Sequence, residues 1–125
     1  MAYQLTLHSK PAYLHAIVTG ENTRENVAGY LQDLRRECSA RGCRRVLVEE
    51  RLNGARLGTS EVFAIVMTEA SRAVGVFEAI AYVDVNAGGD MMKFAENVAL
   101  GRGIPVRLFA SVAEAGKWLE NPWPR

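Results

Sequence analysis

Acidic side chains lie near the ends of two stretches that the sequence predicts to be strands. Glu49 and Glu50 close the run 45–50, and Asp84 lies near the end of the run 78–85. The carboxyl ends of parallel strands meet at one edge of a sheet, so Glu49 or Glu50 could approach Asp84 there. Paired carboxylates could carry acid–base chemistry or hold Mg²⁺. Because no His or Cys accompanies them at ligand spacing, we favour solvated strand ends and expect no metal and no cofactor.

A glycine-rich turn follows the run 78–85. Its residues Asn86, Gly88, Gly89 and Asp90 could form a ligand-binding edge, because glycines let backbone N–H groups approach an anion. The turn lacks the G-x-G-x-x-G pattern and the Walker pattern, and Asp90 would repel a phosphate. We therefore interpret it as a strand-to-helix turn with Asp90 as the helix cap.

Two hydroxyl residues, Thr59 and Ser60, stand at the predicted start of a helix. A phosphate added to either one would be stabilised by the free N–H groups and the dipole of the helix N-terminus. The same residue types are common helix caps, and the carboxylate of Glu61 would repel a phosphate. We therefore expect Thr59 or Ser60 to cap the helix by accepting a backbone N–H two or three residues ahead.

Basic residues gather around the predicted end of the first helix. They could form a docking patch for an acidic protein or a lipid headgroup, although cations are also favoured at a helix C-terminus, which is the interpretation we prefer. We expect no nucleic-acid partner, because no aromatic residues are interleaved with them and the chain has 15 basic against 14 acidic residues. These basic residues are Arg35, Arg36, Arg41, Arg44 and Arg45.

Flexible methionines and phenylalanines follow helical spacing in the second and third predicted helices. We interpret them as core, while noting that such residues also line adaptable apolar pockets. They include Phe63, Met67, Met91 and Phe94. Cys38 and Cys43 have no catalytic partner residues near them in the predicted elements, and we interpret them as core or boundary residues. We interpret His8 and His15 as a surface pair across a hairpin.

All these residues belong to predicted strands and helices, or to the turns between them, which alternate along the chain. Short periodic runs predict strands at 3–8, 13–19, 45–50, 78–85 and 105–109. Helices are predicted after the capping positions 22–23, 59–60, 90 and 111, with a loop at 51–58. The order β-β-α-β-α-β-α-β-α predicts one α/β domain over residues 1–125. Its five-stranded mixed sheet is mostly parallel, with an antiparallel N-terminal hairpin and about four helices.

This pattern resembles the STAS domain of SpoIIAA-like anti-sigma-factor antagonists, in a small stand-alone bacterial form. The strand 45–50, a loop with Gly54, the Thr59-Ser60 pair and the run 106–119 ending in Trp-Leu carry the resemblance. In the antagonists a phosphorylated Ser stands in an Asp-Ser-Ser-Gly-like motif at the second helix. Here that stretch is Gly58-Thr59-Ser60-Glu61, so the flanking Asp and Gly are replaced.

The resemblance implies a non-enzymatic interaction or regulatory module that contacts another protein or a second copy of itself as a homodimer. One alternative is a carrier or sensor of a small apolar or lipid-like ligand, since some STAS-like families are similar in fold to CRAL-TRIO carriers. Another is a small enzyme that uses the acidic strand ends. No apolar stretch is long enough to span a membrane, and residues 1–6 do not begin a signal peptide, so we expect a cytoplasmic location.

Overall fold

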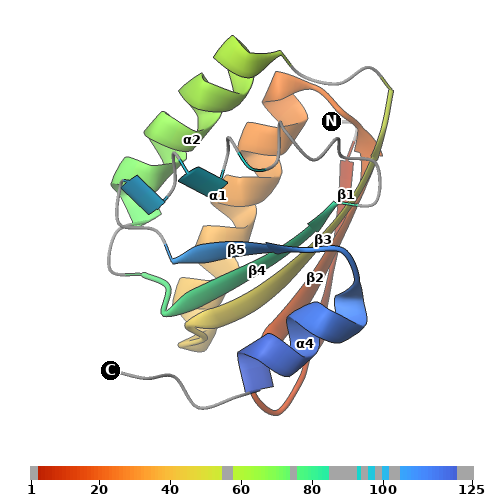
Figure 1. Ribbon diagram of the computed structural model, residues 1–125, viewed down its shortest axis with the longest axis vertical. Helices are drawn as coiled ribbons and strands as arrows, with labels where there is room; N and C mark the ends of the chain where they lie inside the picture. Colours follow the sequence, from red (N-terminus) through yellow and green to blue (C-terminus); the bar gives the residue numbers. More distant parts are fainter. Residues whose placement is uncertain are drawn as a thin grey trace.

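A five-stranded sheet forms the centre of the molecule (Figure 1). The computed structural model describes residues 3–54, 58–73, 76–84, 93, 96–97, 100–101 and 105–120, with the backbone alone at 59, 62, 63, 66, 70, 71, 73 and 84. The strands follow one another in chain order across the sheet. As the sequence predicts, β1 is antiparallel to β2 and the sheet is otherwise parallel. They are β1 (Tyr3–Ser9), β2 (Leu14–Glu21), β3 (Arg45–Asn53), β4 (Ala79–Asp84) and β5 (Val106–Phe109).

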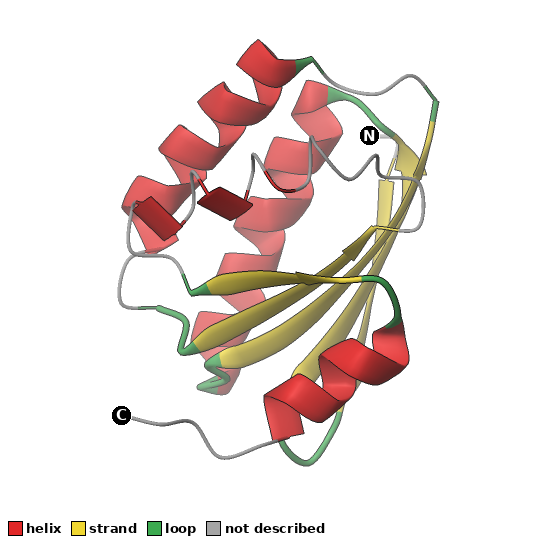
Figure 2. Cartoon of the chain, in the orientation of Figure 1, coloured by secondary structure: helices red, strands yellow, loops and turns green. Residues whose placement is uncertain are grey.

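Helices lie on both faces of this sheet (Figure 2). On one face α1 (Arg24–Arg41) packs on the sheet and α2 (Thr59–Ala73) lies beside it, whereas α4 (Val112–Glu120) covers the other face over β3, β4 and β5. Because successive strand residues point to opposite faces, Val46 and Val48 join the α1 core while Leu47 joins the α4 core. The central strand is therefore apolar on both faces, as is usual for a parallel sheet.

The boundaries of α1 follow from its end residues. The side chain of Thr23 accepts the N–H of Asn26 at 3.1 Å, which confirms the predicted cap at 22–23. At the other end Gly42 adopts the left-handed conformation with φ of 65°, and its N–H and that of Cys43 donate to carbonyls of the last turn. Between these caps the buried face carries Tyr30, Leu34 and Cys38, which recur at helical spacing and form an apolar stripe along α1.

Two elements differ from the sequence prediction in extent. Strand β3 continues to Asn53, although a loop is predicted from residue 51, because Leu52 is buried and pairs with Gly20 of β2. The predicted third helix, after Asp90, falls largely outside the described residues. The positions described between 93 and 101 are helical, and the buried carboxylate of Glu96 accepts the N–H of Leu108 in β5 at 3.0 Å.

Candidate functional site

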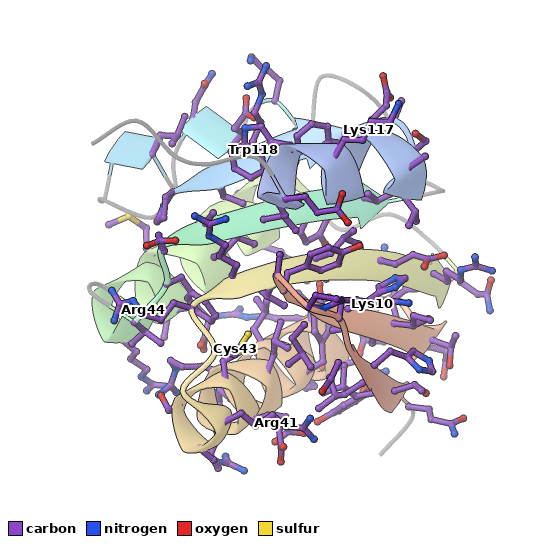
Figure 3. The ribbon with its side chains drawn as sticks, turned by 90° about the horizontal axis from the view of Figure 1, so that it is seen from below. Lys10, Arg41, Cys43, Arg44, Lys117 and Trp118 are labelled. Carbon is purple, nitrogen blue, oxygen red and sulfur yellow. The ribbon has the colours of Figure 1, made fainter. Side chains whose placement is uncertain are left out.

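A hollow of about 420 Å³ opens at the end of the sheet where the parallel strands begin. Its wall is built by the β1–β2 turn (residues 9–14), by the connection from α1 to β3 (residues 41–45), and by Glu78 before β4. These segments are distant in sequence but adjacent in the fold, because Leu14 of β2 pairs with Val46 of β3. Figure 3 shows this end of the molecule, with Lys10, Arg41 and Arg44 around it. We call this site the basic hollow.

The four cations of the basic hollow differ in their contacts. Arg45 is tied into the fold, since its Nε donates to Glu78 at 2.5 Å and its Nη1 donates to the carbonyl of Leu119 at 2.8 Å. Arg41 forms an exposed pair with Glu37 at 3.3 Å, one turn earlier in α1. Lys10 and Arg44 are exposed, and no ion pair forms on either of them among the described residues. The hollow therefore combines one anchored cation with two that are available to a partner.

The members of the predicted arginine patch lie in two different places. Arg41, Arg44 and Arg45 line the basic hollow, whereas Arg35 and Arg36 do not. Arg36 pairs with Asp33 at 3.2 Å, and Arg35 is half-buried with its Nε enclosed and without a hydrogen bond among the described residues. Lys10 is not part of the predicted patch. Its place in the turn before β2, the strand that pairs with β3, is the signal that could have added it.

Glu49 and Glu50 do not form the expected solvated strand ends. Their exposed fractions are 3% and 5%, so that interpretation is wrong. As neighbours on one strand they point to opposite faces of the sheet, and they cannot act together on a ligand. Asp84 pairs with Glu50 in the backbone register, while its side chain lies outside the described part of the chain.

On the α1 face, Glu50 is the centre of a buried polar cluster. One carboxylate oxygen, Oε2, accepts hydrogen bonds from the hydroxyls of Tyr30 and Tyr82, whose oxygens lie 3.0 Å apart. Burial, together with the nearby Glu50 charge, raises the pKa of Tyr82 well above its ordinary value, so this phenol stays protonated and donates. Periodicity could not reveal the cluster, because Tyr30 fits the apolar stripe of α1.

On the opposite face, Glu49 is held by two basic partners. His15 Nε2 lies 2.9 Å from Glu49 Oε1, and the guanidinium of Arg51 donates to the other oxygen. Burial would raise the pKa of Glu49, but the hydrogen bonds from Arg51 and His15 outweigh it and hold this pKa below its ordinary value. His8 lies opposite His15 with ring centroids 6.2 Å apart, and His15 is half-buried rather than a surface residue.

This lowered pKa predicts a loss of stability in acid. A carboxylate with a depressed folded-state pKa stabilises the fold fully above its unfolded-state pKa, and the contribution disappears as the pH falls through the folded-state value. We expect Glu49→Gln to be less stable than the wild type at neutral pH and to lose less stability between neutral and strongly acidic pH. Urea unfolding at a series of pH values measures this, and parallel pH profiles would contradict it.

The start of α2 places the predicted hydroxyl residues differently. The helix begins at Thr59, so Gly58 occupies the capping position, and its N–H donates to Glu61 Oε1 at 3.2 Å. Ser60 lies within the first turn, is exposed, and makes no hydrogen bond among the described residues. Ser60 therefore does not act as the cap among the described residues. The side chain of Thr59 lies outside the described part, so the cap expected from Thr59 or Ser60 stays a prediction.

The exposed hydroxyl of Ser60 makes a clear stability prediction. Because it satisfies no backbone N–H, Ser60→Ala should change the free energy of unfolding by less than about 0.5 kcal/mol. Glu61→Ala should cost about 1 kcal/mol, since it removes the acceptor of the Gly58 N–H. Urea midpoints of the two variants measure the difference, and a larger loss in Ser60→Ala would restore the capping role.

Several predicted site residues cannot be placed. The turn residues Asn86, Gly88, Gly89 and Asp90 lie outside the described residues, as do Met91, Phe94 and the side chain of Phe63. Met67 is half-buried in α2. Cys38 is buried in the α1 core and Cys43 lies at its edge, which confirms the core and boundary interpretation.

Comparison with known proteins identifies the fold. No model of a protein family and no curated protein matches the chain. Among solved structures, the chain is similar to an uncharacterized protein from the DUF3478 family with a SpoIIAA-like fold, from Shewanella loihica PV-4. The TM-score is 0.57 at 17% sequence identity, over 94% of each chain. The protein thus has a SpoIIAA-like fold. None of the described helices has the length and apolar character needed to cross a bilayer.

Proposed function

We propose that this protein is a non-enzymatic interaction module that docks a partner protein at the basic hollow. The observation that carries the proposal is the gathering of four cations from separate segments around one open depression. Attraction to a helix C-terminus accounts for Arg41 but not for Lys10, which belongs to the β1–β2 turn, nor for Arg44, which follows the helix.

Rigid surroundings support a docking role for this end of the molecule. The N–H of Lys10 donates to the carbonyl of Tyr13 at 2.9 Å, and that of Glu78 donates to the carbonyl of Arg44 at 2.7 Å. Arg45 adds a link from β3 to the end of α4. The turn, the strand start and the helix are thereby held in one arrangement, so that little ordering is needed when a partner binds.

Position-specific crosslinking in the cells that make the protein tests this function. A photoreactive residue at position 10 or 44 should give one discrete protein adduct, while the same residue at position 24, at the other end of α1, should not. An adduct of twice the monomer mass would identify a second copy as the partner. Equal adducts from all three positions, or none at the hollow, would contradict the proposal. So would a small molecule that copurifies stoichiometrically in native mass spectrometry, which the carrier alternative expects.

A second proposal concerns regulation at Ser60. Its exposed hydroxyl lies in the first turn of α2, where backbone N–H groups and the helix dipole favour an added phosphate. Ser60 belongs to the stretch Gly58-Thr59-Ser60-Glu61, which by the resemblance corresponds to the motif that holds the phosphorylated Ser, with the flanking Asp and Gly replaced here. Phosphopeptide mapping of protein from its own cells should then find stoichiometric phosphate on Ser60, and its absence under all growth conditions would overturn this proposal.

A further inference from the structure

Resting on the proposed function, we infer that the partner presents an acidic peptide segment, whose carboxylates pair with Lys10 and Arg44 in the basic hollow. The lining carries four cations and the single carboxylate of Glu78, which is already paired with Arg45. Its net charge is +3, whereas the whole chain has a formal net charge of +1.

This distribution means that the rest of the chain is net acidic. Apart from the five charged residues of the lining, the chain carries 11 basic and 13 acidic residues. An acidic segment is therefore attracted more strongly to this end of the molecule than to the rest of the chain. Complementary charge of this kind fixes where a partner docks and accelerates its association.

The geometry favours several carboxylates along a peptide over one phosphate group. Phosphate sites use free backbone N–H groups, often at a helix N-terminus. Here the N–H groups of Lys10, Gly42 and Cys43 all donate to backbone carbonyls of the fold. The helix that reaches the hollow presents its C-terminus, whose dipole is unfavourable for a central anion.

The wall between the cations offers contact for the peptide chain itself. Residues 11–13 of the β1–β2 turn line the hollow with proline, alanine and tyrosine side chains. Tyr13 is half-buried and packs against the α4 core, close to Gly116. Lys10 stands on one side of this turn, and Arg41 and Arg44 approach from the other segment. An extended segment could thus lie over the turn with carboxylates on both sides.

Binding of a defined peptide tests the inference directly. The probe is a fluorescent peptide in which Glu and Ala alternate, compared with the same peptide carrying Gln in place of Glu. We expect the Glu peptide to bind and the Gln peptide not to bind, with affinity falling as salt is raised from about 50 to about 200 mM. Lys10→Glu and Arg44→Glu should each weaken binding by about tenfold.

Arg24→Glu is the matched control, because it makes the same change of charge on an exposed residue at the far end of α1. It should leave the peptide affinity within about twofold. Thermal unfolding shows whether each variant is folded, and Lys10→Gln and Arg44→Gln provide milder substitutions.

Three results would overturn the acidic-peptide inference. The first is the same loss of affinity in Arg24→Glu as in the hollow variants. The second is displacement of the peptide by equimolar inorganic phosphate or by a single-stranded oligonucleotide. The third is failure of the folded wild type to bind the Glu peptide while the crosslinks at positions 10 and 44 still form. In that third case the docking function stands and the acidic character of the partner is refuted.

Discussion

Glu50→Ala should lower the free energy of unfolding by about 2–4 kcal/mol. The substitution removes the oxygen that accepts hydrogen bonds from the hydroxyls of Tyr30 and Tyr82, both in the α1-side core. The two hydroxyls, 3.0 Å apart, can still bond to each other. Both nevertheless lose the charged acceptor to which they donate, and a space opens where the carboxylate stood. Urea unfolding monitored by circular dichroism measures the loss.

Two further variants serve as comparisons for this prediction. Glu50→Gln keeps the size of the side chain and one acceptor oxygen, so it should cost about 1–2 kcal/mol. Glu37→Ala removes a solvent-accessible carboxylate that pairs with Arg41 on the surface of α1, and it should change stability by less than about 0.5 kcal/mol. If Glu50→Ala were as stable as Glu37→Ala, the tyrosine hydroxyls would have to find other partners, and the cluster would not hold α1 to the sheet.

Leu34→Ala should destabilise the protein by about 2–5 kcal/mol, the range for emptying a well-packed core position. Leu34 is 3% exposed and lies in the same cluster as Val46 and Val48 of β3. Leu31→Ala, one turn earlier and only partly buried, should cost less. Midpoints of urea unfolding compare the two, and an equal or larger loss at Leu31 would contradict the assignment of helix faces.

The succession of strands and main helices along the chain was predictable because periodicity and caps are local signals. Val46 to Val48, Thr23 and Gly42 each specify their element by side-chain type and position. The β1–β2 hairpin followed from the short turn at Lys10. The paired extension of β3 to Asn53 was not predictable, since it depends on the neighbouring strand and not on the alternation of its own residues.

The candidate site was less predictable, because its chemistry comes from contacts between distant residues. Charge clustering found Arg41, Arg44 and Arg45, but Lys10 joins them only through the parallel pairing of β2 with β3. The sequence alone predicts that Glu50 is a solvated strand end. Its role as a hydrogen-bond acceptor depends on two tyrosines that are 20 and 32 residues away in the sequence. Single-sequence patterns contain no signal for such partners.

The opposite orientation of Glu49 and Glu50 has a consequence for how the chain avoids misfolding. Among the described residues, the tyrosine hydroxyls that donate to one carboxylate lie on the α1 face, and His15 with Arg51, which hold the other carboxylate, lie on the opposite face. A slip of β3 by a single residue against its neighbours would exchange the faces of both side chains. Two buried acids would lose their partners at once, each at the cost of an unpaired buried charge. The adjacent glutamates therefore help to specify the register of β3. They favour the native alignment over one-residue slips more strongly than the neighbouring valines and leucines do, because those apolar residues can replace one another.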